Sequence, residues 1–390
     1  MLQYISASVV YPVSSPPVEN GVIALEEDGT VHAVLHLQQA KEQGIENIRH
    51  YDGFLIPGLI NTHCHLELSH LFGKIPEHTG LQAFVQQVIK HRDSSEELIL
   101  EAMQKADREM LENGIVAVGD ISNQLVSRDT KTGSSLYYHT FIETLGFNPA
   151  QAKTIFEKAL KMKEEFAPLK ASIVPHAPYS ISKELFAAIK DYSFKVHNLV
   201  SIHNQETEDE NLFFQSKQGA FLRLYEFLGL DISFFSATGK SSLQSVVEEL
   251  PESRLLLVHN TLTSAEDVRF AESVHGGLYW CLCPNANLYI ENGLPDVHML
   301  ADAGLNITLG TDSLASNHQL SILSEMKTLQ ENFGLSFETL LKWATWNGAA
   351  FLGIEGEYGT LEKGKRPGLN LVEFAPEGKI SSKTSIRRII

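Results

Sequence analysis

The amino-acid sequence predicts an α/β protein, namely a (β/α)8 (TIM) barrel with a small β-sandwich domain built from both chain ends. Through the middle of the chain, eight short apolar segments alternate with longer amphipathic or charged ones. These eight segments spread over roughly 260 residues, which is typical of such a barrel. Both ends of the 390-residue chain have the pattern of β structure instead. Together these observations favour one large barrel over two ordinary domains.

The two chain ends, residues 1–56 and 357–390, are rich in strand-like segments. Near the N-terminus, "YISASVVYP" alternates loosely, and "GVIALEEDGTVHAVLHL" predicts a hairpin that turns at Asp28 and Gly29. Near the C-terminus, "GTLEKGKRPGLNLVEF" and "SIRRII" are short strand-like stretches. We expect the two ends to pair into one composite β-sandwich domain; two separate appendages are the alternative.

The middle of the chain, residues 57–356, is the predicted barrel. Its candidate strands are 55–61, 115–120, 137–143, 171–175, 196–202, 254–258, 278–283 and 305–310. Helix-like stretches lie between them, for example 96–113, 182–190 and 318–333. A doubly wound open sheet is the competing fold. No glycine-rich phosphate loop follows any of these strands, which disfavours the nucleotide-binding versions of that fold.

Composition excludes several classes of partner. The net charge of −17 disfavours nucleic acid, because phosphate binding needs a basic surface. No run of eighteen apolar residues predicts a membrane span. The N-terminus lacks the pattern of a signal peptide, and the cysteines are few: Cys64, Cys281 and Cys283. We therefore expect a cytoplasmic protein without disulfide bonds.

Polar side chains gather at the C-terminal ends of the predicted strands, where barrel enzymes have their active sites. They are His63 and His65 on the first strand, His176 on the fourth, His203 on the fifth, His259 on the sixth and Asp312 on the eighth. Side chains alternate along an extended chain, so the first two histidines point to the same face. Cys64 then points to the opposite face, and we interpret it as a small buried hydrophobe.

These residue types favour a metal site. His63, His65, His203 and Asp312 would give three imidazoles and one carboxylate, a set that suits zinc or a similar divalent ion with one position open. A carboxylate directly after an apolar strand is costly to bury without a partner, and a metal is such a partner. Glu206 follows three residues after His203 and is a candidate general acid/base. The alternative places it in a solvated acidic helix start.

Loops are expected to set specificity, and the candidates are 66–82, 122–135, 144–150, 177–180 and 284–294. Within the first, Glu67 shares the parity of the two histidines and would point into the mouth of the site if the chain stayed extended. Asn285, in "CPNANLYIENG", is a candidate hydrogen-bonding partner for substrate, with an ordinary turn residue as the alternative.

The motifs "PGLINTHCHLELS", "HAPYS", "HNQE", "LVHN" and "GTDSLASN" follow one another in a familiar order. They resemble the amidohydrolase superfamily, and within it the branch of cytosine, guanine and adenosine-type deaminases and chlorotriazine hydrolases. The resemblance covers nearly the whole chain, including the β-rich ends. "HLELS" is similar to the deaminases of aminated futalosine.

The resemblance implies roles for individual residues. One divalent metal, Zn²⁺ before Fe²⁺ or Mn²⁺, would be held by His63, His65, His203 and Asp312. Glu206 would protonate a ring nitrogen of the substrate, and His259 with Asp312 would steer the proton of the attacking water. His176 would contact substrate, and Ser313, which stands where many relatives have glycine, is a further candidate contact. The fourth strand ends without the lysine of binuclear members, which favours a single metal.

The expected function is hydrolytic deamination of an aminated purine- or pyrimidine-like heterocycle or nucleoside, with release of ammonia. The metal would lower the pKa of a water molecule from about 15.7 toward 7, with Glu206 as the proton shuttle. One alternative is hydrolysis of a different bond, either a C–Cl bond with release of chloride or an amide-type C–N bond. The other is a non-catalytic barrel. The expected partner is a small aminated heterocycle, and a homodimer is compatible with the sequence.

Overall fold

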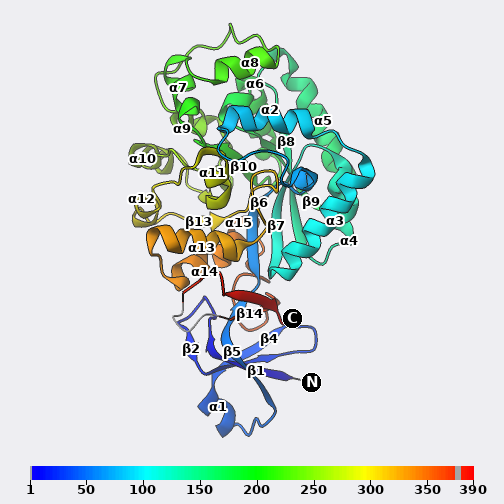
Figure 1. The fold of residues 1–390 in the computed structure, drawn as a ribbon, viewed down its shortest axis with the longest axis vertical. Helices are drawn as coiled ribbons and strands as arrows, with labels where there is room; N and C mark the ends of the chain where they lie inside the picture. The colour runs from blue at the N-terminus through cyan, green and yellow to red at the C-terminus, as the bar shows by residue number, and fades with distance from the viewer. Residues whose placement is uncertain (1, 374–378) are drawn as a thin grey trace.

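The computed structural model of the chain describes residues 2–373 and 379–390. In Figure 1, helices surround the central strands in the upper part of the molecule, and both chain ends lie in the lower part, beside the strands of one sheet. None of the described helices has the length and apolar character needed to cross a membrane.

Both chain ends contribute to one mixed sheet, with strand order β15-β14-β5-β1-β3-β4 and with β2 paired to β1. The sequence predicted a sandwich here; the described residues form a single sheet. Gly29 makes the expected hairpin turn between β3 and β4, with a φ of 85°. The strands are β1 (Gln3–Val10), β2 (Val18–Glu19), β3 (Gly21–Leu25), β4 (Val31–His36), β5 (Ile48–Pro57), β14 (Leu369–Glu373) and β15 (Ser385–Arg388).

The middle of the chain forms two parallel sheets of four strands each, in sequence order. The first holds β6 (Leu59–Cys64), β7 (Ile115–Ser122), β8 (Tyr137–Thr144) and β9 (Lys170–Pro175). The second holds β10 (Val200–Asn204), β11 (Leu255–His259), β12 (Leu278–Leu282) and β13 (Ile307–Leu309). Every predicted strand overlaps one of these.

Two predicted strand boundaries were wrong. The segment 55–61 is divided, since β5 ends at Pro57 in the terminal sheet and β6 begins at Leu59. Gly58 lies between them, and a side chain there would collide with Val116 and the carbonyl of Pro367. The segment 196–202 forms a strand from Val200 onward.

Backbone hydrogen bonds connect the two parallel sheets at both edges. At one edge, the amide of His203 donates to the carbonyl of His176 over 2.9 Å. At the other, the amides of Thr311 and Asp312 both donate to the carbonyl of His63 over 3.1 Å. Four of these five residues were predicted to belong to the site. The edges where the sheets meet therefore bring the ends of the first, fourth, fifth and eighth strands together.

Helices cover the outer faces of these sheets and pack on a large apolar cluster. Several begin after a residue whose side chain caps the helix: the helix at 96–112, for example, follows Ser95, whose hydroxyl accepts the amide of Leu98. The helices are α1 (Leu37–Glu42), α2 (Leu81–His91), α3 (Glu96–Glu112), α4 (Arg128–Gly133), α5 (Ala152–Glu165), α6 (Lys183–Ser193), α7 (Glu208–Ser216), α8 (Phe221–Phe227), α9 (Ser242–Val246), α10 (Ala265–Val274), α11 (Pro284–Glu291), α12 (Val297–Asp302), α13 (Ile322–Phe333), α14 (Phe337–Ala344) and α15 (Trp346–Leu352).

Candidate metal and active site

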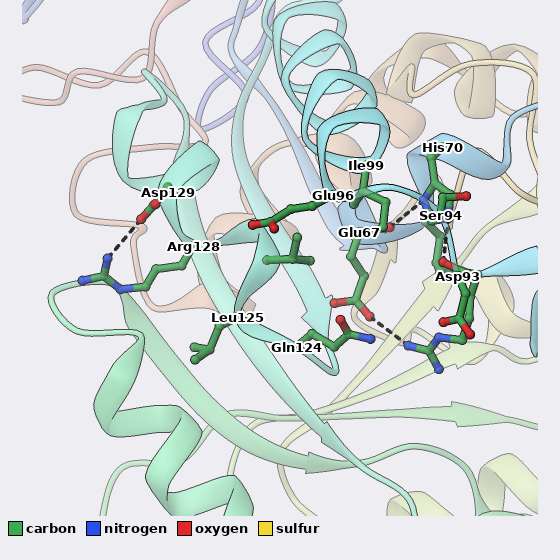
Figure 2. Close-up of a pocket in the computed structure, with 13 residues that line it drawn as sticks. Glu67, His70, Asp93, Ser94, Glu96, Ile99, Gln124, Leu125, Arg128 and Asp129 are labelled. Atoms are coloured by element: carbon green, nitrogen blue, oxygen red, sulfur yellow. Dashed lines mark hydrogen bonds and ion pairs between the residues drawn. The ribbon is translucent and has the colours of Figure 1, made fainter.

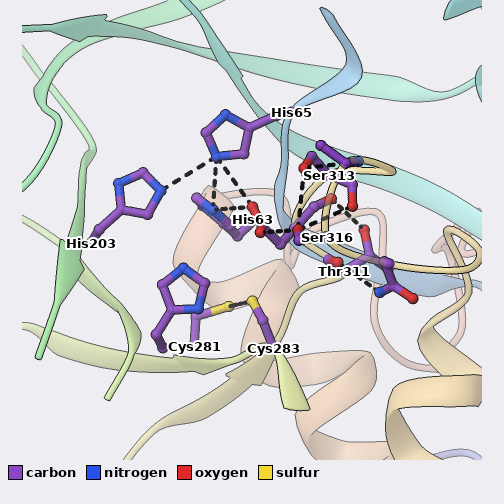
Figure 3. Close-up of polar contacts among 12 residues, drawn as sticks. His63, His65, His203, Cys281, Cys283, Thr311, Ser313 and Ser316 are labelled. Carbon is purple, nitrogen blue, oxygen red and sulfur yellow. Dashed lines mark hydrogen bonds and ion pairs between the residues drawn. The ribbon is translucent and has the colours of Figure 1, made fainter. Parts of the chain in front are cut away.

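Four potential ligand atoms converge at the strand ends (Figure 3). The Nε2 atom of His65 lies 3.2 Å from Nε2 of His63 and 3.3 Å from Nε2 of His203. The Oδ1 atom of Asp312 lies 3.4 Å from Nε2 of His65 and 3.5 Å from Nε2 of His63. All four side chains are buried. Alternation along β6 therefore places the two histidines of "HCH" together, and Cys64 between them is fully buried.

The spacing of these atoms fits a shared cation. A tetrahedral zinc ion with bonds of about 2.0–2.1 Å separates its ligand atoms by roughly 3.3–3.4 Å. Four of the six separations among these atoms run from 3.2 to 3.5 Å. Three nitrogens and one carboxylate oxygen are also a donor set that zinc accepts. The residues therefore fit one divalent ion.

The surrounding hydrogen bonds prepare the ligands for a cation. Nδ1 of His203 lies 2.7 Å from the carbonyl of His176, which can only accept, so Nδ1 carries the proton. Burial holds the pKa of His203 well below its ordinary value, so the ring is neutral and its Nε2 offers a lone pair. The hydroxyl of Ser316 donates to Oδ2 of Asp312 over 2.5 Å and fixes that carboxylate. Such outer contacts orient metal ligands.

Glu206 and His259 lie beside the four ligands. Oε1 of Glu206 is 3.7 Å from Nε2 of His259, and both side chains are buried. Burial raises the pKa of Glu206 to about 7, against the opposing charge of His259. Burial alone lowers the pKa of His259, but the carboxylates of Glu206 and Asp312 outweigh it, and the pKa is raised. Glu206 is therefore populated in both protonation states near neutral pH, beside a histidine that favours its charged form.

The backbone is strained at two of the predicted site residues. His259 has a φ of 76° and Asp312 a φ of 55°, values in the left-handed region that few residues other than glycine adopt. His259 ends β11, and Asp312 lies three residues after the end of β13. Strain of this kind persists where surrounding contacts over-determine the conformation, and it clusters at functional sites.

A cavity of about 170 Å³ opens at the strand ends, and three of the four ligands line it. The predicted site residues His65, His176, His203, Glu206, His259, Asp312 and Ser313 line it. Each of the five loops expected to set specificity contributes at least one lining residue: Leu68, Asn123, Leu145, Tyr179 and Ile290 are examples. Helix α2 adds an apolar wall made of Leu81, Phe84, Val85, Val88 and Ile89.

The structure places Glu67 outside this cavity. The expectation that the chain stays extended past His65 was wrong, because residues Leu66–Leu71 form a 3-10 helix, η1. The carboxylate of Asp120 accepts the amide of Leu66 over 2.7 Å and turns the chain there. Glu67 accepts the amide of Asn123 and lines a neighbouring pocket, where Figure 2 shows it beside Gln124.

Asn285 also lies outside the cavity. Its amide group and its backbone N–H donate to Glu325, and its side-chain oxygen accepts from Thr328. It joins the start of α11 to α13. This structural role agrees with the alternative interpretation of Asn285, in which it does not contact substrate. Two residues further, Asn287 lies with Oδ1 at 2.8 Å from Nδ1 of His259 and holds that ring.

Sequence reasoning missed several lining residues. Glu143 ends the predicted strand "YYHTFIE" just as Asp312 follows another apolar strand, so the same signal was present. Arg92 lies one residue past α2, and its guanidinium is 3.8 Å from Glu67. No sequence pattern indicated that α2 and Arg92 fold over the strand ends.

Comparison with known families decides the affiliation of the chain. The model of the amidohydrolase family matches residues 54–387. The chain belongs to the amidohydrolase family. The resemblance drawn from the motifs is thereby confirmed, and a member of this family with this site is a hydrolase that acts on C–N bonds.

Among curated proteins, this amidohydrolase is 27% identical to an adenosine deaminase of Helicobacter pylori over 82% of its own length and 79% of the relative's. It is 26% identical to a 5-methylthioadenosine/S-adenosylhomocysteine deaminase of Bacillus cytotoxicus, over 93% and 83%. It is 26% identical to an aminodeoxyfutalosine deaminase of Nitratiruptor, over 84% and 80%.

Solved structures share the fold. An aminofutalosine deaminase of Helicobacter pylori, solved with methylthio-coformycin, matches with a TM-score of 0.80 at 23% identity, over 97% of this chain and 93% of that one. A zinc-bound adenosine deaminase of Xanthomonas campestris matches with a TM-score of 0.73 at 23% identity, over 96% and 85%. A triazine hydrolase of Arthrobacter aurescens matches with 0.73 at 17%, over 95% and 86%.

Proposed function

We propose that this amidohydrolase is a metal-dependent deaminase that replaces the exocyclic amine of a purine-like nucleoside by oxygen and releases ammonia. The observation that carries the proposal is the buried Glu206–His259 pair beside four convergent ligand atoms in one cavity. The names of the relatives support it, since they deaminate adenosine, 5-methylthioadenosine, S-adenosylhomocysteine or aminodeoxyfutalosine.

In this proposal His63, His65, His203 and Asp312 hold one divalent ion, and zinc is the ion we favour. When bound, the ion supplies Lewis acidity that makes water acidic near neutral pH. Glu206 accepts a proton at its carboxylate and delivers it to the ring nitrogen next to the carbon under attack. A carboxyl with a pKa of about 7 suits this task, because it is populated in both protonation states.

His259 orients the attacking water in the proposed mechanism. Its Nδ1 is held by Asn287 at 2.8 Å, so its Nε2 faces Glu206 in a fixed direction. His176 lines the cavity with Nδ1 at 2.8 Å from the hydroxyl of Ser180, and we assign its exposed edge to substrate. Ser313 is the second substrate contact kept from the sequence-based prediction.

The same proposal includes the architecture. We assign residues 57–356 to a closed (β/α)8 barrel, since the two parallel sheets are hydrogen-bonded at both edges. We assign residues 1–56 and 357–390 to the composite β domain, since β5 pairs with β14. Ligands from strands 1, 5 and 8 of such a barrel would surround one central ion.

The variant Glu206→Gln tests the proposed role of the carboxylate. It should keep a stoichiometric divalent ion, because Glu206 is not one of the four ligands. Loss of a general acid/base should reduce turnover of adenosine or 5-methylthioadenosine by about 10²–10⁴-fold. Metal analysis and ammonia release measure the two effects. An E206Q protein with parental turnover would contradict the assignment, and Glu208→Gln, at the start of α7, is the control.

The rival reaction is release of chloride from a triazine, because triazine hydrolases share the fold. The presence of Glu206 next to His259 favours deamination, which needs a proton for a ring nitrogen. Measuring ammonia against chloride release from matched aminated and chlorinated substrates separates the two reactions.

A further inference from the structure

One oxygen of Glu143 has no hydrogen-bond partner although the residue is buried. Glu143 lies near the end of β8 and lines the cavity, with 4% of its side chain exposed. Its Oε2 accepts from the amide group of Asn123 over 2.8 Å, whereas its Oε1 accepts from nothing in the described structure. A buried carboxylate oxygen without a donor is costly, so its persistence needs an explanation.

Neighbouring protein groups do not satisfy this oxygen. The nearest candidate, Nδ1 of His203, is 3.6 Å away, which is too long for a hydrogen bond. That nitrogen already donates to the carbonyl of His176, so it neither donates to Glu143 nor offers a lone pair for a second metal ion. The carboxylate is also fixed in direction: Asn123 holds one oxygen, and the backbone amide of Asn123 is in turn held by Glu67.

The surroundings restrict what Oε1 can bind. Arg92 lines the same cavity and brings a positive charge, which disfavours a cationic ligand. A neutral donor such as a hydroxyl carries no such penalty. His203 points its Nε2 toward the ligand cluster and its Nδ1 toward Glu143. A substrate group bound to Glu143 would therefore be separated from the reacting centre by the imidazole ring of His203. A substituent of the substrate ring would lie at that distance, and the reacting atoms would not.

We infer that Glu143 is a specificity-determining residue whose free oxygen accepts a hydrogen bond from a sugar hydroxyl of the nucleoside. The inference rests on the proposed function and deepens it, because it selects nucleosides over free bases and over deoxynucleosides that lack the contacting hydroxyl. Glu143 binds the part of the substrate that does not react, and Glu206 and His259 act on the part that does.

The test compares adenosine, 2′-deoxyadenosine, 3′-deoxyadenosine and adenine as substrates for the parent protein and Glu143→Leu. The parent should prefer adenosine over one deoxy analogue by about three- to tenfold in kcat/KM, the value of one hydrogen bond. E143L should lose this preference, so that its kcat/KM for adenosine falls toward its kcat/KM for that analogue. Its metal content should equal that of the parent. Glu164→Gln, an exposed glutamate on α5, is the control.

Two results would overturn the inference about Glu143 and leave the proposed function intact. One is an equal loss of kcat/KM for all four substrates in E143L; the other is a loss of bound metal, which would make Glu143 a positioning residue for His203. A parent protein that binds its metal but releases ammonia from none of the four compounds, and from none of 5-methylthioadenosine, S-adenosylhomocysteine and aminodeoxyfutalosine, would contradict the proposed function itself, and with it this role of Glu143.

Discussion

At the scale of single residues, a buried ion pair supports the metal-binding strand. Lys131 and Asp120 are both fully buried, with Nζ 2.6 Å from Oδ2. Nζ also donates to the hydroxyl of Ser122 over 2.8 Å. The other carboxylate oxygen accepts the amide of Leu66, directly after the predicted ligand His65. The Lys131–Asp120 pair therefore helps to hold the turn of the chain directly after His65.

Replacing Lys131 by Met should destabilise the protein by about 3–5 kcal/mol, because Asp120 keeps a buried charge without its partner. The double variant K131M/D120N should recover part of this loss, since the charge is removed as well. Denaturant unfolding of the metal-free proteins measures both. Lys161→Met removes an exposed pair with Glu165 and should cost no more than about 1 kcal/mol. A K131M protein as stable as K161M would contradict this account.

At the scale of elements, one carboxylate connects α13 to two segments near the site. Glu325 of α13 accepts from the backbone and side-chain N–H groups of Asn285, at the start of α11. It also accepts from the amide group of Asn317, which follows Asp312 and donates to the carbonyl of Thr311 as well. Through these hydrogen bonds, α13 helps to hold the loop that carries the predicted metal ligand Asp312.

Burial raises the pKa of Glu325 to about 8, although its hydrogen-bond donors oppose the shift. In the unfolded chain a glutamate has a pKa of about 4.3. The native state therefore binds the extra proton between these two values, and the free energy of unfolding falls as pH rises from about 4.3 to 8. Glu325→Gln should make the fall in the free energy of unfolding less steep, as measured by unfolding of metal-free protein across that range. Glu331→Gln, exposed on the same helix, should keep the parental slope.

At the scale of the whole molecule, the sequence predicted the strands and the ligand ends better than the covering elements. Runs of apolar residues predicted all eight strands. The alternation of side chains along a strand predicted that His63 and His65 point to the same side. Glu67 could not be placed by parity, because the bond from Leu66 to the distant Asp120 ends the extended chain. The amphipathic pattern of α2 indicates a helix, but which surface it covers depends on contacts between distant segments.

A metal at the predicted site would connect both parallel sheets. Its four ligands lie on β6, directly after β6, on β10 and after β13, so they come from both sheets and from both edges where the sheets meet. An ion that binds the native state at a free concentration of about 100 times its Kd adds about 2.7 kcal/mol to the free energy of unfolding. Metal binding should therefore stabilise the molecule as a whole, not one loop.

Removing metal with a chelator should lower the melting temperature of the parent by roughly 5 °C, given about 2 °C per kcal/mol for a chain of this size class. Adding back Zn²⁺ should restore it, because imidazole nitrogens bind zinc well, whereas Mg²⁺, which prefers oxygen ligands, should not. Asp312→Asn loses one charged ligand and should respond weakly to zinc. Equal melting temperatures of stripped and zinc-loaded parent would contradict a site that spans both sheets.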